Sequence, residues 1–311
     1  MNKPQDIVLL GPTCSWKSSA AIRIAQKLDA EIVSCDSMQV YKGLEIGTAQ
    51  PSSKELAAVP HHLIGILDIH EVYDVSRFLA LATNTLEEIH SRGKRAIIVG
   101  GTGLYAKALV YGHTLLPANA ALFSQIKAQL EAPDGRRQLE EELSAVARGR
   151  DNIPKDILLN PRRLLRAVEV ARLTGRTPWE LNSSTNTPNP EFSQFVILPD
   201  LELLKARIRQ RTAAMMAQGW VQETQRAIGN GLMETPTARQ ALGYRDIADF
   251  LSGNGPDSLA DLEILLVSRT IHYARRQFTW FKHQHPGAAF IPITPNDTPL
   301  ETITSAVLNH A

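Results

Sequence analysis

The sequence predicts an α/β fold built on a parallel sheet, with an all-helical domain inserted into it. Three observations lead to this prediction. Short apolar runs alternate with helical patterns near both ends of the chain, as they do in repeated βαβ units. A loop of small and polar residues joins the first apolar run to the first helical pattern. Residues 118–181 contain helical patterns alone, so we place a core domain at 1–115 and 191–311 and a helical insertion at 116–190.

Composition and charge limit the classes of function. The chain has 311 residues, 43% of them hydrophobic, which suits one large or two modest globular domains. Its net charge of +1 supplies no general attraction to nucleic acid or membrane, so any nucleic-acid surface must be a local patch. No apolar run is long enough to span a bilayer, and residues 1–6 lack the apolar region of a signal peptide, so we expect a cytoplasmic protein.

The loop after the first predicted strand, at 7–10, has the features of a phosphate-binding P-loop. It consists of Gly11, Pro12, Thr13, Cys14, Ser15, Trp16, Lys17 and Ser18. Strand, tight loop and helix follow one another, so backbone N–H groups and the helix N-terminus would surround a phosphate. Lys17 would reach the phosphate oxygens, and the Ser18 hydroxyl would bind Mg²⁺. The structural alternative is an ordinary strand-to-helix turn.

Trp16 departs from the P-loop pattern, which has glycine before the lysine. Two geometries are open for this side chain. The indole either swings outward and leaves the backbone N–H groups usable, or it fills the phosphate cradle. We expect a weakened but working site, in which replacement of Trp16 by glycine would tighten the binding of diphosphate and raise turnover.

Two further strands end in polar loops, which a parallel sheet would bring beside the P-loop. The strand at 31–34 leads to Asp36, Ser37, Met38 and Gln39. The Asp36 carboxylate fits a general base or a metal-assisting group, and fits a turn cap equally well. The strand at 95–99 leads to two glycines and Thr102, where backbone approaches a ligand closely or simply turns into a helix.

The two cysteines are Cys14 and Cys35, and no metal-type spacing of cysteine and histidine occurs. We expect both to be buried, reduced thiols.

The insertion contains a helix at 160–174 with basic residues on one side. Arg162, Arg166 and Glu169 share a face, opposite to Leu164 and Leu165, and Arg163 lies near that face. A basic helix face is usually only solvated, but arginines next to a phosphate-binding core favour contacts with a polyanion. Residues 182–190 are polar and contain prolines, which is typical of a linker.

The remainder of the core is predicted to hold a strand at 195–198, an edge strand at 289–293 and four helices. These helices are placed at 201–218, 220–228, 237–251 and 259–282. Met215 and Met216 are interpreted as core filling. The aromatic cluster at 278–281 is interpreted as the anchor of a helix end, with base stacking as the alternative.

Taken together, these motifs resemble the tRNA dimethylallyltransferase (isopentenyltransferase) family over residues 7–293. The shared patterns are Gly-Pro-Thr-x-Ser-x-Lys-Ser at 11–18, Asp-Ser-x-Gln-Val-Tyr at 36–41, Gly-x-x-Ile-Gly-Thr-Ala-x-Pro at 43–51, Pro-His-His-Leu at 60–63, Gly-Gly-Thr-Gly-Leu-Tyr at 100–105, Arg-Arg-Leu-Leu-Arg-Ala-Val-Glu-Val at 162–170, Ala-Leu-Gly-Tyr at 241–244 and Arg-Arg-Gln-Phe-Thr-Trp-Phe at 275–281. Their order and spacing are far more specific than the P-loop alone.

The resemblance implies a P-loop NTPase-like core that transfers a dimethylallyl group from its diphosphate to an adenine amine. The adenosine lies 3′ of the anticodon in tRNAs that read codons starting with U. The resemblance assigns Asp36 as general base, Thr102 as a nucleotide contact, residues 11–18 as the diphosphate site and residues 36–39 and 162–166 as tRNA contacts. Mg²⁺ is the expected cofactor, and a monomer is expected.

Trp16, Met38 and Cys14 depart from the residues common in the family at these positions. Two alternatives therefore stay open: a tRNA-binding homologue with impaired catalysis, and a kinase or transferase that acts on free adenine nucleotides. The helical insertion argues against the second, because a free nucleotide needs no such domain.

Overall fold

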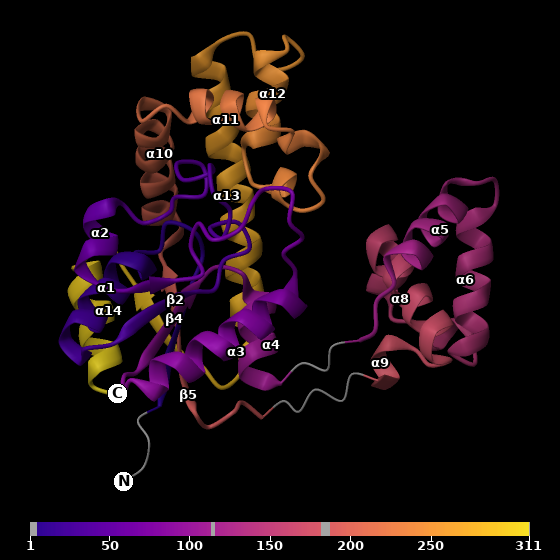
Figure 1. Cartoon of the computed structure of the whole chain (residues 1–311), viewed down its shortest axis with the longest axis horizontal. Coiled ribbons are helices and arrows are strands. Elements are labelled where there is room, and N and C mark those ends of the chain that lie inside the picture. Colours follow the sequence, from indigo (N-terminus) through magenta and orange to yellow (C-terminus); the bar gives the residue numbers. More distant parts are fainter. Residues whose placement is uncertain (1–4, 113–115, 182–186, 311) are drawn as a thin grey trace. The chain divides into compact units, whose positions relative to one another are not determined.

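The computed structural model describes residues 5–112, 116–181 and 187–310, and Figure 1 shows its course. The chain divides into two compact units. One consists of Met1–Tyr111 and Asn186–Ala311, and the other of Gly112–Thr185. Residues 182–186 of the predicted linker lie outside the described residues. No described helix is long and apolar enough to cross a bilayer.

The larger unit is built on a six-stranded parallel sheet with the order β3-β2-β4-β1-β5-β6. Its strands are β1 (Asp6–Leu10), β2 (Glu31–Ser34), β3 (His61–His62), β4 (Ala96–Gly100), β5 (Phe192–Pro199) and β6 (Ala289–Ile293). Five of these were predicted from apolar runs, and β6 lies at an edge as expected. The predicted α/β fold with a parallel sheet is confirmed.

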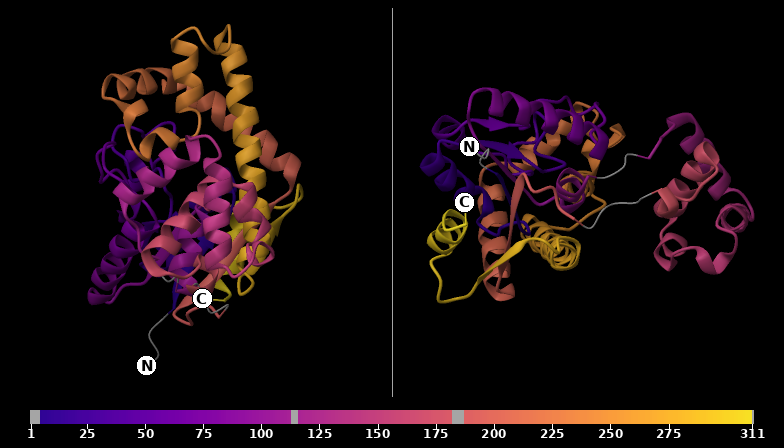
Figure 2. Two further views of the ribbon diagram at one scale, coloured as in Figure 1. Left: turned by 90° about the vertical axis from the view of Figure 1, so that its right-hand side faces the viewer. Right: turned by 90° about the horizontal axis from the view of Figure 1, so that it is seen from below.

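Helices cover both faces of this sheet. Consecutive strand residues point to opposite sides, and in the central strands the residues on both sides are mostly apolar and must be buried. One face packs on α1 (Lys17–Leu28) and α14 (Pro299–Leu308), with Ile7 and Leu9 among the buried strand residues. The other packs on α3 (Val75–Ser91) and α4 (Gly103–Tyr111), with Val8 and Leu10 buried there. Figure 2 shows the yellow α14 and the purple α3 on opposite sides of the strands. A short helix, α2 (Ser53–Ala58), packs against α1.

A group of helices completes the larger unit beyond β5. It comprises α10 (Leu201–Ala217), α11 (Trp220–Gly229), η2 (Leu232–Glu234), η3 (Ala238–Gln240), α12 (Tyr244–Leu251) and α13 (Leu259–Gln284). The prediction of one helix over 237–251 is wrong. Gly243 has φ +89° and lies against the Trp220 ring, so the chain turns there and α12 begins after the turn. Phe281 at the end of α13 is fully buried, which confirms that the aromatic cluster anchors this helix.

The smaller unit is helical throughout its described residues. Its elements are α5 (Ala120–Glu131), α6 (Gly135–Val146), η1 (Arg150–Asn152), α7 (Lys155–Leu159), α8 (Pro161–Thr174) and α9 (Pro178–Leu181). Asn160 caps α8 by accepting from the N–H groups of Arg162 and Arg163, and Gly175 ends the helix with φ +69°. The unit has a separate core, in which Leu139, Leu143 and Leu164 are fully buried.

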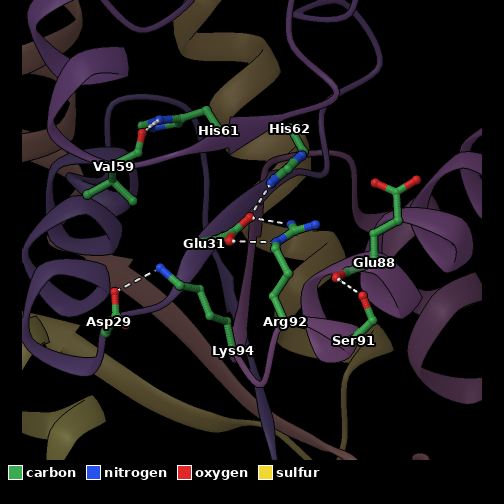
Figure 3. A network of polar contacts seen from close by, with 9 residues as sticks. All are labelled: Asp29, Glu31, Val59, His61, His62, Glu88, Ser91, Arg92 and Lys94. Carbon is green, nitrogen blue, oxygen red and sulfur yellow. Dashed lines mark hydrogen bonds and ion pairs between the residues drawn. The ribbon is translucent and has the colours of Figure 1, made fainter.

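A polar network fastens the β3 edge of the sheet, and Figure 3 shows it from close by. The buried Glu31 carboxylate accepts from His62 Nε2 at 2.7 Å and from Arg92 Nη2 at 2.8 Å. The Asp29–Lys94 ion pair lies beside it. Burial alone would raise the pKa of Glu31, but the hydrogen bonds from Arg92 and His62 outweigh it and hold this pKa below its usual value.

We predict that Glu31→Gln lowers the free energy of unfolding by about 1–2 kcal/mol at neutral pH, since charged hydrogen bonds are lost. A carboxyl group with a depressed pKa stabilises the fold above its unfolded pKa, and this contribution disappears as pH falls through the folded value. The difference between parent and variant should therefore shrink between about pH 5 and pH 3 in urea titrations. Glu87→Gln, at an exposed position of α3, is the matched control. An equally large effect of that control would contradict the assignment.

Candidate functional site

A cavity of about 310 Å³ opens at the carboxyl ends of β1, β2 and β4, within the larger unit. The loops after these strands form its floor, and α10 and α13 form its wall. The residues that line it include Thr13, Cys14, Lys17, Ser18, Asp36, Ser37, Met38, Gln39, Gly47, Thr48, Gly101, Ile208, Arg211, Thr212, Met215, Trp220, Gln240, Leu242, Thr270, Tyr273, Arg276 and Gln277. The predicted loops, which lie far apart in the sequence, therefore meet at one cavity.

The loop of residues 11–18 folds as a tight turn into α1. Pro12 accepts from Ser15 N–H and also from Lys17 Nζ at 3.1 Å. Cys14 and Trp16 both have positive φ, at 64° and 63°, a region that glycine enters more easily than other residues. The Gly11 backbone is closely surrounded, since a Cβ there would lie 2.7 Å from Ser15 Oγ. Ser18 is exposed at the start of the helix and lines the cavity.

The Trp16 indole lies outside the set of residues that line the cavity. It packs on the core between the sheet, α1 and α14, and the guanidinium carbon of Arg207 lies 4.6 Å from its ring centre. Of the two geometries open from the sequence, the structure has the outward one. The backbone of the loop keeps the left-handed conformation while the ring points away from the cavity.

Lys17 lies in an electropositive part of the cavity. Burial and the nearby Arg211 guanidinium lower its pKa to about 8, and Asp36 opposes this only in part. Arg211 Nη1 approaches the Cys14 thiol at 3.6 Å. Among the described residues, Arg211 and Lys17 form no ion pair with a carboxylate. Two cations that face one cavity without such a partner make a site suited to an anion.

The Asp36 side chain combines the two roles left open by the sequence. Its Oδ1 atom accepts from Met38 N–H at 2.9 Å and from Gln39 N–H at 3.3 Å, which is turn capping. Its Oδ2 atom forms no hydrogen bond within the described part of the chain, and the residue lines the cavity. One oxygen therefore fixes the carboxylate while the other is available to a ligand.

Thr102 does not line the cavity but supports the loop that carries Asp36. Its Oγ1 accepts from Ser37 N–H at 3.0 Å, and its own N–H donates to the Cys35 carbonyl at 3.3 Å. Gly100 permits this contact, because a Cβ at that position would lie 1.9 Å from the Cys35 oxygen. Cys14 and Cys35 are both buried and free, as predicted.

Gln277 of α13 joins two of the loops. Its Oε1 accepts from Thr13 N–H at 2.8 Å, and its Nε2 donates to the Gly101 carbonyl at 2.9 Å. The residue is 7% exposed. Gln277 belongs to the 275–281 motif, but nothing in the sequence indicates this role.

The sequence analysis missed the contribution of α10 to the cavity. Arg211, Thr212 and Met215 line it. Met215 and Met216 both pack on the core, as interpreted from the sequence, and Met215 has the cavity as a second contact. A signal was present: Ile208, Arg211, Thr212 and Met215 recur at helical spacing, which places them on one face. That pattern alone does not tell a wall of a cavity from a buried stripe.

The arginines of α8 differ from one another in their surroundings. Arg166 donates to the carbonyls of Leu116 and Pro117 at 2.8 and 2.9 Å and pairs with buried Glu169 at 2.5 Å. Arg163 pairs with Asp156. Arg162 is exposed and has no ion-pair partner among the described residues.

The Leu164 and Leu165 side chains lie in the core of the helical unit, which leaves them no surface for a partner.

Comparison with known proteins gives consistent matches. The family model described as IPP transferase matches residues 39–284. A tRNA dimethylallyltransferase of Thermus thermophilus is 39% identical over 92% of both chains. One of Deinococcus radiodurans is 37% identical over 91% of this chain and 92% of its own.

Solved structures agree with these matches. The tRNA isopentenylpyrophosphate transferase of Bacillus halodurans has a TM-score of 0.70 at 30% identity and covers 99% of this chain and 96% of its own. A eukaryotic dimethylallyltransferase, described as acting on tRNA, has a TM-score of 0.80 at 25% identity, with 98% and 79% covered.

We predict that the affinity for inorganic diphosphate falls as pH rises through about 8, because the Lys17 ammonium loses its proton there. An anion favours the charged amine, so the weakening should approach tenfold by about pH 9. Lys17→Arg keeps its charge in this range and should lack this component of the pH profile. Calorimetric titrations from about pH 7 to pH 9 compare the two profiles, and parallel profiles would exclude Lys17 as the titrating group.

Proposed function

The chain belongs to the IPP transferase family, and on that premise we propose that it transfers a dimethylallyl group from dimethylallyl diphosphate to tRNA. The acceptor we propose is the exocyclic amine of the adenosine 3′ of the anticodon, in tRNAs that read codons starting with U. The observation that carries this proposal is one cavity lined both by Lys17 and Ser18 of the P-loop and by Asp36. Similarity to tRNA dimethylallyltransferases over more than 90% of the chain favours tRNA over a free adenine nucleotide as acceptor.

The diphosphate would bind at the P-loop end of the cavity. Backbone N–H groups at the start of α1, the Lys17 ammonium and the Arg211 guanidinium supply donors and positive charge there. Ile208, Met215 and Leu242 line the same cavity and offer an apolar surface to the five-carbon chain. Charge and apolar surface are thus arranged as an allylic diphosphate requires.

Mg²⁺ is the cofactor we propose, and the residues present fit it. No cluster of three or more His, Cys, Asp or Glu side chains that could hold a metal occurs in the described residues. The Ser18 hydroxyl lines the cavity and would hold Mg²⁺ together with diphosphate oxygens and water, as the serine or threonine of a P-loop does. Mg²⁺ would neutralise charge on the leaving diphosphate.

In the reaction, the bond between the allylic carbon and the diphosphate oxygen breaks, and the diphosphate leaves with its electron pair. Lys17 and Arg211 stabilise the charge that develops on it. The adenine amine forms the new carbon–nitrogen bond and gives up a proton, which Asp36 Oδ2 accepts. Thr102 would hold the Asp36 loop in place through Ser37.

The helical unit would contact the tRNA backbone through exposed basic side chains. Arg162 is the member of the α8 group that is free to do so, whereas Arg166 is committed to the chain that precedes α5. Residues 36–39 at the cavity would meet the nucleotide itself. We propose a cytoplasmic monomer.

The outward position of Trp16 argues against a tRNA-binding homologue without activity, because the cavity stays open. The experiment that tests the function is the transfer of a labelled dimethylallyl group to an anticodon stem-loop with adenosine 3′ of the anticodon. The same assay with AMP tests the free-nucleotide alternative. Labelling of AMP at an equal rate would exclude the proposal, and so would binding of tRNA without any transfer.

We predict that Asp36→Asn lowers the rate of this transfer by about two to four orders of magnitude, because the amine loses its proton acceptor. The amide keeps an oxygen that can cap the loop, so affinity for the stem-loop should change little. Single-turnover kinetics and a binding titration measure the two quantities. Near-normal turnover would remove the role of Asp36 as base.

We predict that Arg162→Ala flattens the dependence of tRNA affinity on salt by about 0.7–0.9 log units per log unit, the value for one lost phosphate contact. Thermal stability should not change, because Arg162 pairs with no described side chain. Arg166→Ala serves as the contrast: it should lower the stability of the helical unit through the loss of its contacts with Leu116, Pro117 and Glu169. An unchanged salt slope in Arg162→Ala would mean that this position is only solvated.

A further inference from the structure

Two contacts join the P-loop to α10. Arg211 reaches the Cys14 thiol at 3.6 Å, and Arg207, one helical turn earlier, lies over the Trp16 ring at 4.6 Å. Positions i and i+4 share a helix face, so both guanidinium groups meet the same loop. Lys17 follows Trp16 directly and faces the cavity.

Arg207 is not held by an ordinary ionic partner. No carboxylate pairs with it among the described residues, and its buried Nε atom has no hydrogen-bond partner. Burial and the nearby Arg211 lower the pKa of this side chain. The guanidinium stacks on the indole, and stacking uses its face, so its N–H groups are not taken up by the contact with the ring.

Trp16 supports this arrangement although its backbone conformation is unfavourable. A residue with a Cβ at φ 63° is strained where glycine would not be, and strain of this kind persists when surrounding contacts hold it. The indole packs on the same buried cluster as Leu203 of α10 and turns its face to Arg207. The ring is therefore held by packing contacts between the P-loop and α10.

We propose that Trp16 is a positioning residue, which holds the Arg207 guanidinium at the rim of the P-loop so that it binds the outer phosphate of a diphosphate ligand. This inference rests on the proposed function, since it assumes that a diphosphate occupies the P-loop. Lys17 and Arg211 line the inner cavity, and Arg207 adds a third cation outside its lining. On this proposal the site favours a diphosphate over a single phosphate, because a single phosphate held by Lys17 and Arg211 has no second group for Arg207 to bind.

The test measures the dissociation constants of inorganic diphosphate and of orthophosphate, both with magnesium, by calorimetry on the full chain. Trp16→Leu removes the aromatic face and keeps the Cβ and the backbone strain, whereas Trp16→Phe keeps an aromatic face. Arg207→Gln removes the charge. We expect Trp16→Leu and Arg207→Gln each to weaken diphosphate binding about three- to thirty-fold. This range corresponds to the free energy of a cation–π contact converted to a change in affinity. Trp16→Phe should retain most of the affinity.

Two further results separate positioning from mere support of the fold. The affinity for orthophosphate should change less than about twofold in every variant, because Arg207 is proposed to bind only the outer phosphate of a diphosphate. The double variant should bind diphosphate no more weakly than the worse single variant, because both changes remove one guanidinium contact. Melting temperatures report on folding, and Arg207→Gln keeps the test decisive if Trp16→Leu does not fold.

For Trp16→Gly, this proposal reverses the expectation drawn from the sequence. Glycine relieves the backbone strain but leaves Arg207 without its platform, so diphosphate affinity should fall as in Trp16→Leu. Tighter binding by Trp16→Gly, equal losses for both anions, or additive losses in the double variant would each overturn the proposal. A parent protein that transfers dimethylallyl groups while its variants bind diphosphate normally would refute this inference alone. A parent that binds no diphosphate would refute the proposed function as well.

Discussion

The site depends on one buried side-chain amide. Gln277 accepts from the P-loop at Thr13 and donates to the loop after β4 at Gly101, so it fixes two strand ends relative to each other and to α13. An amide suits this position because it offers a donor and an acceptor at once, and a buried backbone N–H or carbonyl without a partner is costly. Thr102 in the loop after β4 holds the Asp36 loop in turn through Ser37 and Cys35, so Lys17 and Asp36 can act on the same ligand.

The same constraint explains why small residues gather where the loops meet. A Cβ on Gly101 would lie 2.5 Å from Gln277 Nε2, and one on Gly47 would lie 2.1 Å from Trp220 Nε1. Glu223 of α11 accepts from the N–H groups of Ile46 and Gly47 and so draws this loop to the rim of the cavity. Glycine is needed at these positions because a side chain lies close against the backbone, and not because the backbone has a positive φ.

Sequence patterns predicted most of the sheet, because strands buried on both faces read as apolar runs bounded by polar loops. They failed at β3, whose two histidines lack any apolar signal and join the sheet beside β2, where His62 reaches Glu31. They also failed at Gly243, where packing against Trp220 from another helix turns the chain. In both places the decisive contact comes from a residue far away in the sequence, which no local pattern contains.

The site shows the same division between local and distant information. Residues on the three loops were predicted because each follows a strand. Arg211 and Gln277 come instead from helices, 197 and 264 residues after the P-loop residues that they contact. Trp16 shows why identity at a motif position is not enough. The pattern marks an indole there as an obstruction, yet the loop keeps the left-handed backbone and directs the ring toward Arg207. Whether a bulky residue blocks a phosphate site thus depends on where its neighbours let the side chain go, and here α10 provides that place.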